Sequence, residues 1–395
     1  MDFSDLIAPI PADRFMRDYF GRKPLHIPGN GEGGSGRRGL LPWERLNAIL
    51  AQRPHWTPGN IKLIMNNHPV GSEHYLDPVP TAEGVAMRAD PAKVHHFLAM
   101  GASLVADALE DVDPAIAQVV SMLGTTFAAK GGANAYCSFR DVQAFASHCD
   151  THEVFAIQLH GEKSWRVYEN RAEAPVRALT GDGAQAIIDR AKGGVAMEVL
   201  MRPGDLIYLP RGFYHDATAR SDVSLHLTLA VLPMTGVAAL RMLVDQAEED
   251  PVLRAYLADG RDAGALADHL ATLAEKITAT LESPLFRSDV IVRQRSLAGR
   301  YYQPNLPDRP ALSFYAATGR PAQVLRRAEG AVLRHGNGED PLGLLSGPAQ
   351  WVLEQQAFAV QQLAARFAWM QPGEVTTLIR LFEQAGLIQA YQPQM

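Results

Sequence analysis

Between residues 131 and 232, the apolar residues of this chain recur with a period of two, which is typical of strands that bury one face. Turns rich in Gly, Pro and charged residues separate these segments, and an insertion at residues 180–194 predicts one short helix. The six predicted strands span residues 132–139, 153–160, 163–169, 197–201, 205–210 and 223–232. Antiparallel strands that enclose polar residues are typical of a double-stranded β-helix, or jelly-roll barrel. The pattern predicts an α+β protein with this barrel as its core.

Three polar side chains converge on one point of the predicted barrel. His148 and Asp150 are two residues apart, so on an extended strand both project from the same face. A Pro-Arg-Gly turn at residues 210–212 reverses the chain, and His215 follows it, which returns a second imidazole beside the first. Two histidines and one carboxylate form the facial triad that binds non-haem Fe(II) and leaves three coordination positions open.

Lys163 is the second feature of the predicted site. It follows the turn at Gly161, and strand alternation directs Lys163 and Trp165 to the inside of the barrel. A buried lysine needs an anionic partner, and a dicarboxylate that chelates the iron at one end would supply that partner at its other end. The hydroxyls of Tyr136 and Thr228 offer hydrogen bonds to the same distal carboxylate.

His226 leaves an alternative open, because with His148 and His215 it would complete a three-histidine zinc or manganese site. It shares a strand face with Thr228, so it points into the barrel if Thr228 does. We interpret His226 as a neighbour of the metal ligands or of the dicarboxylate rather than as a ligand.

The segments that carry these residues resemble a known protein family. They read NAYCSF, HCDTHEVFAIQLHGEKSW, PGDLIYLPRGFYH and SLHLT in chain order. The first three contain the patterns NxY, HxDxxxxFxxQxxGxKxW and PRGxxH at compatible spacing. With these three patterns the chain resembles the JmjC-type cupin oxygenases. Within that family it looks most like the ribosomal oxygenases, which hydroxylate a side chain of a ribosomal protein.

The resemblance implies a dioxygenase that uses Fe(II), 2-oxoglutarate and O₂ to hydroxylate a protein side chain, an Arg or a His of a ribosomal protein. Bacterial members that act on arginine tend to carry Arg at the position of Lys163, so the modified residue stays open. The resemblance implies three metal ligands, which are His148, Asp150 and His215. It also implies three residues that contact 2-oxoglutarate, which are Lys163, Tyr136 and Thr228.

Three alternative functions are compatible with parts of this pattern. Demethylation of N-methyl-lysine in a protein needs the same chemistry on a different carbon atom. A metal-cupin isomerase or dioxygenase that does not use 2-oxoglutarate would make Lys163 a surface residue. A binding protein with a degenerate site is disfavoured, because all three ligand positions are filled.

The regions on either side of the barrel have helical spacing. Helices and short strands before residue 131 complete an oxygenase domain at residues 1–234, and residues 91–123 predict two consecutive helices. Residues 235–285 carry apolar stripes, and because the resembling family pairs its subunits through such a segment, we expect a helical dimerisation region and a homodimer. Residues 286–395 predict a linker and a winged-helix-like domain, from the order helix, turn, helix and strand.

The composition restricts the partners and the compartment. A net charge of −6 gives no general attraction to nucleic acids or anionic membranes, and acidic residues outnumber basic ones after residue 341. We therefore expect no direct DNA binding and no membrane association. The two cysteines, Cys137 and Cys149, fit small buried residues in a reducing compartment, and the chain shows neither a signal peptide nor a long apolar run. These features predict a cytoplasmic protein.

Overall fold

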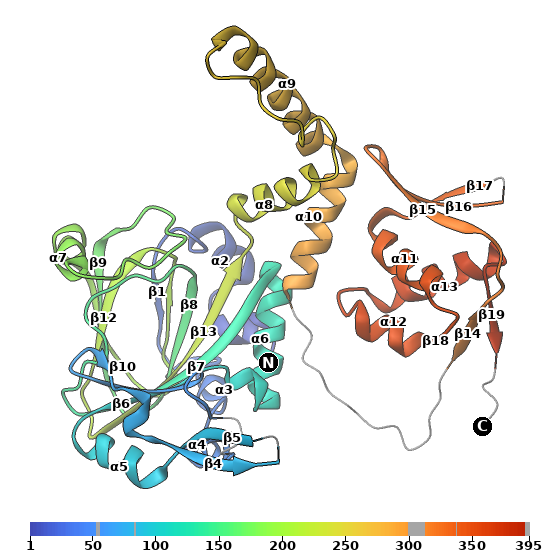
Figure 1. Ribbon diagram of the computed structural model, residues 1–395. Helices are drawn as coiled ribbons and strands as arrows, with labels where there is room; N and C mark the ends of the chain where they lie inside the picture. The colour runs from blue at the N-terminus through green and yellow to red at the C-terminus, as the bar shows by residue number, and fades with distance from the viewer. Residues whose placement is uncertain (53–55, 83, 299–312, 337, 392–395) are drawn as a thin grey trace. The chain divides into compact units, whose positions relative to one another are not determined.

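The computed structural model describes residues 1–52, 56–82, 84–298, 313–336 and 338–391 (Figure 1). They divide into two compact units, Met1–Pro233 and Met234–Met395. The predicted barrel lies in the first unit, and each unit has an apolar core of its own. Every helix in the described part of the chain is too short or too polar to cross a membrane.

Two antiparallel sheets form the barrel of the first unit (Figure 1). The larger sheet has the strand order β1-β11-β8-β13-β7-β6-β2-β3, and the smaller has the order β10-β9-β12. Their strands are β1 (Leu25–Ile27), β2 (Ile61–Met65), β3 (His68–Pro69), β6 (Ser103–Ala106), β7 (Ala129–Phe139), β8 (Glu153–His160), β9 (Lys163–Arg171), β10 (Val195–Met201), β11 (Leu206–Leu209), β12 (Phe213–Ala219) and β13 (Val223–Pro233). All six strands predicted between residues 131 and 232 are confirmed.

Strand β8 shows how alternation builds two cores from one segment. Phe155 and Ile157 pack into the core that the larger sheet shares with the N-terminal helices. Val154 and Ala156 point the other way, and they pack with Trp165 of β9 in the core between the two sheets. Both faces of β8 are therefore buried, as expected for its continuous apolar run at residues 154–157.

Helices cover the outer face of the larger sheet. Phe3 and Phe127 pack edge to face with ring centroids 5.2 Å apart, and Asp113 caps the helix that ends at Phe127 by accepting from the Ala115 and Ile116 amides. The helices of this unit are α1 (Phe3–Ile7), α2 (Ala12–Asp18), α3 (Gly34–Arg38), α4 (Trp43–Leu50), α5 (Pro91–Ala99), α6 (Pro114–Phe127) and α7 (Ala184–Ala191), with short 3₁₀ turns η1 (Ser72–His74) and η2 (Leu109–Asp111).

The prediction of two consecutive helices over residues 91–123 is wrong in one part. Helix α5 ends at Ala99, and Gly101 follows with a φ of 93°, in the region that favours glycine. Ser103–Ala106 then form β6, which pairs with β2 and β7 and is buried along its whole length. A hairpin of β4 (Leu76–Thr81) and β5 (Gly84–Ala89) was also not predicted.

The described part of the second unit contains helices and two three-stranded sheets, β18-β14-β19 and β15-β16-β17. Helices α8 (Gly236–Ala247), α9 (Ala263–Glu282) and α10 (Pro284–Leu297) occupy its first part. Its apolar core lies further along the chain, around Leu333, Leu363 and Phe382. The remaining elements are β14 (Phe314–Ala317), β15 (Ala322–Arg327), β16 (Gly330–His335), β17 (Gly338–Pro341), η3 (Gly343–Leu345), α11 (Ser346–Glu354), β18 (Ala357–Ala359), α12 (Val360–Arg366), α13 (Pro372–Gln384) and β19 (Ile388–Tyr391).

Candidate active site

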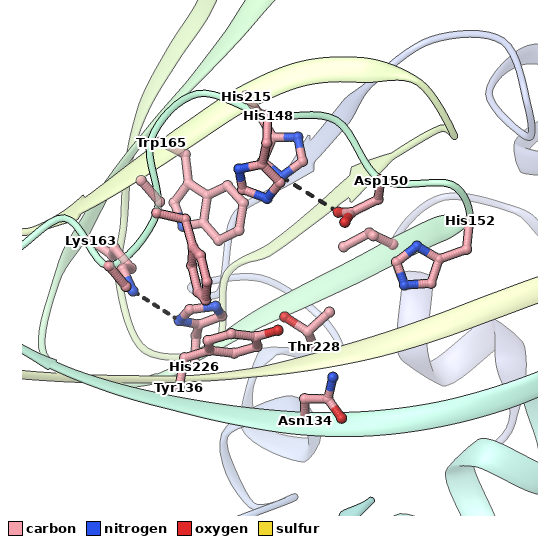
Figure 2. Close-up of a pocket in the computed structure, with 14 residues that line it drawn as sticks. Asn134, Tyr136, His148, Asp150, His152, Lys163, Trp165, His215, His226 and Thr228 are labelled. Atoms are coloured by element: carbon pink, nitrogen blue, oxygen red, sulfur yellow. Dashed lines mark hydrogen bonds and ion pairs between the residues drawn. The ribbon is translucent and has the colours of Figure 1, made fainter. Parts of the chain in front are cut away.

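A pocket of about 260 Å³ lies between the two sheets of the barrel (Figure 2). Strands of both sheets line it, so its walls come from segments far apart in sequence. The lining residues are Asn134, Tyr136, Ala144, Phe145, His148, Asp150, His152, Val154, Lys163, Trp165, His215, Ala217, His226 and Thr228. All six residues that we predicted as metal ligands or 2-oxoglutarate contacts are among them.

The backbone brings His148 and His215 together. His148 lies outside the regular strands, and it forms an isolated antiparallel bridge with His215 of β12. The amide of His148 donates to the carbonyl of His215 at 3.0 Å, and the amide of His215 donates to the carbonyl of His148 at 2.8 Å. Directly opposed residues project to the same side, and the two ring centroids are 4.5 Å apart.

A carbonyl oxygen fixes the proton on each of these imidazoles. Nδ1 of His148 lies 2.9 Å from the carbonyl oxygen of Ala146, and Nδ1 of His215 lies 3.0 Å from that of Phe213. Because a carbonyl oxygen only accepts, each Nδ1 carries a hydrogen. Nε2 is therefore the ring nitrogen that each histidine can offer to a metal ion.

Asp150 completes a group of potential metal ligands. Its Oδ2 lies 3.6 Å from Nε2 of His215, and one ligand atom from each of His148, Asp150 and His215 lies within 4.8 Å of the others. In Figure 2 the carboxylate points towards the two imidazoles. Two imidazole nitrogens and one carboxylate oxygen on one side of a cavity fit the donor set of a non-haem Fe(II) site.

The protonation states at this end of the pocket suit a cation. Burial and the nearby His148 lower the pKa of the His215 imidazole to about 4, so it is neutral at pH 7. Burial by itself raises the pKa of the Asp150 carboxyl, but His215, His148 and His152 outweigh it, and the pKa lies below its ordinary value. Neutral imidazole and ionised carboxylate are the forms that bind a metal ion.

Lys163 lies at the opposite end of the pocket (Figure 2) and is only 2% exposed. Its Nζ lies 3.3 Å from Nδ1 of His226 and 3.4 Å from Oγ of Ser138. Burial lowers the pKa of the lysine to about 8, and the neighbouring Cys137 opposes this only in part. Burial and the lysine together hold the pKa of His226 well below its usual range, so its imidazole is neutral. Among the described residues, no carboxylate forms an ion pair with Lys163.

Strands β7 and β13 supply the wall between these two ends. Their register sets Tyr136 opposite His226 and Asn134 opposite Thr228, so all four side chains share one face. The rings of Tyr136 and His226 stack with centroids 4.7 Å apart and planes within 6° of parallel. Burial raises the pKa of Tyr136, whose hydroxyl therefore remains a hydrogen-bond donor at neutral pH.

Several pocket residues were not predicted as site residues. His152 lines the pocket beside Asp150 (Figure 2), and its buried Nδ1 has no hydrogen-bond partner among the described residues. The same two-residue alternation that links His148 to Asp150 would have pointed to it. The Nε1 of Trp165 is likewise buried without a partner in the described part of the chain. Asn134 begins the NxY pattern, but its side chain had no predicted role.

Comparisons with known proteins agree with the motifs. Residues 111–238 match the JmjC domain. Ribosomal oxygenase 1 of Rattus norvegicus is 30% identical over 257 residues, which cover 62% of this chain and 41% of the rat protein. A Drosophila persimilis protein named bifunctional lysine-specific demethylase and histidyl-hydroxylase NO66 is 29% identical over 238 residues. These residues cover 60% of this chain and 32% of the Drosophila protein. The chain thus spans well under two thirds of the length of these relatives.

The solved structures of an Escherichia coli protein extend the likeness to the fold. The ribosomal oxygenase YcfD is 13% identical, with a TM-score of 0.51 over 97% of this chain and 98% of that chain. A second YcfD structure, in complex with cobalt and 2-oxoglutarate, has a TM-score of 0.50 at 13% identity. The likeness covers 97% of this chain and 99% of that chain. At this identity the likeness concerns the fold alone, and it supports a cupin-like fold of mixed helices and sheets. The resemblance inferred from the motifs is therefore confirmed: the chain contains a JmjC domain at residues 111–238, and its relatives are ribosomal oxygenases.

Proposed function

We propose that the protein is an Fe(II)- and 2-oxoglutarate-dependent oxygenase that hydroxylates a protein side chain. The observation that carries the proposal is one pocket with a metal-ligand triad at one end and, at the other, a buried lysine with no carboxylate partner among the described residues. When bound, iron and 2-oxoglutarate would supply the oxidising power that puts one atom of O₂ into a substrate C–H bond, and succinate and CO₂ would form.

The residues of this chain would then have separate tasks. His148, Asp150 and His215 would hold the metal ion on one face and leave the other face open. Lys163 would bind the distal carboxylate of 2-oxoglutarate, with hydrogen bonds from the hydroxyls of Tyr136 and Thr228, which line the same pocket. Our interpretation of His226 as a neighbour of the 2-oxoglutarate site, and not a metal ligand, is supported by its contact with Lys163.

The primary test is the consumption of 2-oxoglutarate. Purified protein with Fe(II), ascorbate and O₂ should convert 2-oxoglutarate to succinate slowly, and faster once a substrate is present. A metal cupin that does not use 2-oxoglutarate would form no succinate. That outcome would favour the isomerase or dioxygenase alternative.

We propose a ribosomal protein as the substrate, with an Arg or a His as the modified residue. The names of the relatives support this, since they include ribosomal oxygenases and a histidyl-hydroxylase. One of these names also includes a lysine-specific demethylase, so demethylation of N-methyl-lysine is the second candidate. Mass spectrometry of ribosomal proteins from cells with and without the chain separates the two. A lost shift of +16 Da indicates hydroxylation, and a gained methyl group indicates demethylation.

We propose that the protein forms a homodimer through residues 235–285. Helix α8 carries three exposed apolar side chains, Val237 (46% exposed), Leu240 (51%) and Val244 (60%). Their spacing places them on one face of the helix. Helix α9 has no buried residue among those described. Light scattering at micromolar concentration should report a dimer, and Leu240→Asp with Val244→Asp should give a monomer. Arg241→Ala, on the same helix, is the control, and a monomeric wild-type protein would contradict the proposal.

We further propose a three-part division of the chain into an oxygenase domain at 1–234, a helical dimerisation region at 235–285, and a linker with a winged-helix-like domain at 286–395. Helices α11, α12 and α13 beside the sheet β18-β14-β19 support the last part. Acidic residues outnumber basic ones after residue 341, which favours a structural or protein-binding role over DNA binding. A gel-shift assay should show no binding of duplex DNA at physiological salt.

The proposed compartment is the cytoplasm. Cys137 and Cys149 are both free thiols, which fits a reducing environment. Fractionation of cells that express the tagged full chain tests this.

A further inference from the structure

The insertion between β9 and β10 packs behind the metal-ligand segment. Its helix α7 contributes Ile188 to a small apolar cluster on the outer side of the smaller sheet. Tyr168 of β9 and Tyr214 of β12 complete the buried part of this cluster, and Cys149 packs against it. Cys149 stands between His148 and Asp150 in the sequence, so the insertion contacts the segment that carries two of the three triad residues.

Ser147, the residue before His148, has both of its polar oxygens engaged. Its hydroxyl donates to Oδ2 of Asp216 at 2.7 Å and accepts from Nζ of Lys192 at 3.0 Å. Its carbonyl oxygen accepts from Nε2 of Gln185 at 3.2 Å. Gln185 lies on α7 and Lys192 directly follows it, so two of these three hydrogen bonds come from the insertion.

Asp216 joins the segments of both triad histidines from outside the pocket. It follows His215 on β12, and strand alternation turns its carboxylate to the opposite side, where it is 1% exposed. Besides the Ser147 hydroxyl, it accepts from the Tyr168 hydroxyl at 2.6 Å. Nε of Arg166 donates to its other oxygen at 2.9 Å, and Nη2 of Arg166 forms an ion-pair contact with the same oxygen at 2.9 Å. Three hydrogen bonds and an ion pair around one carboxylate make a rigid connection.

We infer that Asp216 and Lys192 are positioning residues for the metal site, acting through Ser147. His148 lies outside the regular strands, so its backbone lacks the continuous ladder that fixes His215. A segment that is ordered before the metal binds loses less conformational entropy on binding, and its affinity for the metal is correspondingly higher. The inference rests on the proposed metal site, and it assigns the insertion a role in metal affinity.

The alternative is that the network only stabilises the fold. The two roles differ in what they predict for a folded variant. A stabilising contact changes the unfolding temperature and leaves the metal affinity of the folded protein unchanged. A positioning contact changes the metal affinity of protein that is still fully folded.

Titration with Co(II), followed by its visible absorption in the absence of O₂ and 2-oxoglutarate, tests the inference on the full chain. Asp216→Asn should weaken Co(II) binding roughly 10- to 100-fold, the range for the loss of an outer-shell partner. Its control is Asp205→Asn, which removes a buried carboxylate that accepts from His26 and the Arg202 amide and lies outside the pocket lining. Circular dichroism and melting temperatures establish that each variant is folded at the titration temperature.

Lys192→Met tests the contribution of the insertion separately. It should weaken Co(II) binding by a smaller factor, about 3- to 10-fold, because one of several contacts to Ser147 is lost. Arg190→Met is the matched control, since Arg190 lies on α7 and, within the described residues, its side chain donates to the Ala186 carbonyl of that helix and not to Ser147. If Asp216→Asn does not fold, Tyr168→Phe removes a single hydroxyl from the same carboxylate and serves in its place.

The outcomes distinguish this inference from the proposed function. Unchanged Co(II) affinity in folded Lys192→Met and Tyr168→Phe would overturn the positioning role and leave the metal site intact. Absence of Co(II) binding by the wild-type protein would overturn the metal site itself, and the positioning role with it. Weaker binding in the variants but not in Asp205→Asn and Arg190→Met would support the inference.

Discussion

The two ends of the pocket differ in the charge they are built to receive. At the triad end, two imidazoles whose Nδ1 atoms are held by carbonyl oxygens and an ionised carboxylate present metal-binding atoms and one negative charge. At the other end, the ammonium of Lys163 lies among neutral groups, the imidazole of His226 and the hydroxyl of Ser138. The first end is incomplete without a cation, and the second is incomplete without an anion. A metal ion chelated by one end of a dicarboxylate satisfies both.

The two ends also differ in how the chain supports them. The lysine end is built on long, regular strands, where β7, β9 and β13 fix each side chain by alternation and register. The triad end depends on the isolated bridge between His148 and His215, on the hydrogen bond from the Gly212 amide to the Asp150 carbonyl, and on the contacts of Ser147 behind it. Substitutions at the two ends should therefore have separable effects, on the metal at one end and on 2-oxoglutarate at the other.

The largest effect is expected at the triad end. His148→Ala, Asp150→Ala or His215→Ala should each abolish Co(II) binding at micromolar concentration and the formation of succinate, because two ligands no longer define a facial site. His160→Ala is the control, since His160 lies exposed at the end of β8 and outside the pocket lining. Succinate formation at the wild-type rate in all three triad variants would refute the assignment.

At the lysine end, the expected effect is on the cosubstrate alone. Lys163→Ala should weaken the binding of 2-oxoglutarate by about 2–5 kcal/mol, the range for removal of one partner of a buried charge pair, and leave Co(II) affinity nearly unchanged. Lys163→Arg should retain part of the affinity, because the charge remains while the planar group needs more room. Calorimetry on the Co(II)-loaded protein without O₂ measures both, with the exposed Lys130→Ala on β7 as control. Equal affinities of wild type and Lys163→Ala for 2-oxoglutarate would contradict the role of the lysine end in binding the cosubstrate.

The sequence predicted the pocket residues better than it predicted what supports them. Tyr136, Lys163 and Thr228 could be assigned to the pocket because the direction of a strand side chain depends on a local period of two. The contact of Ser147 with Asp216 joins residues far apart in sequence, and it depends on the register of the bridge between His148 and His215. Nothing in either local sequence specifies that register.

The same reason explains the elements that the sequence did not predict. Ser103–Ala106 are four buried residues, and a short apolar run does not distinguish a strand from a continuing helix. Strand β4 contains Pro78 and Pro80, which local rules take as evidence against a strand, yet it pairs with β5 as a two-stranded hairpin. In both cases, pairing with a distant or neighbouring strand outweighs the local preference.

The pH dependence of binding should separate the two ends further. With a pKa of about 8, Lys163 is protonated below pH 8 and loses its charge as the pH rises through that value. The affinity for 2-oxoglutarate should therefore be constant between pH 6.5 and 7.5, and it should be about tenfold weaker at pH 9. Lys163→Arg stays charged over this range, so its affinity should not fall. A parallel decline in both proteins would attribute the loss to the triad end.

The smallest effect expected is on the stability of the protein without ligands. Because the pKa of Lys163 in the folded state lies below 10.5, folding disfavours the charged lysine, and this costs about 3 kcal/mol at neutral pH. Lys163→Met removes that cost together with two long hydrogen bonds, to His226 and Ser138, which together contribute about 1–2 kcal/mol. The difference is a gain of about 1–2 kcal/mol, or roughly 2–8 °C in melting temperature at pH 7.

The stability advantage of Lys163→Met shrinks at high pH and reverses when ligands are bound, which makes it specific to the lysine. Between pH 8 and 10.5 the unfolded chain binds more protons at this position than the folded chain, so wild-type stability rises with pH and the advantage of Lys163→Met shrinks. With Co(II) and saturating 2-oxoglutarate, the wild-type protein gains stability from ligand binding, and the variant gains less because its affinity is lower. Melting temperatures at pH 7 and 9.5, with and without ligands, test both changes. A Lys163→Met variant that is less stable than wild type without ligands would mean that the lysine completes the fold. If Lys163→Met is more stable than wild type without ligands and less stable than wild type with them, the buried lysine serves to bind the anion and not to stabilise the fold.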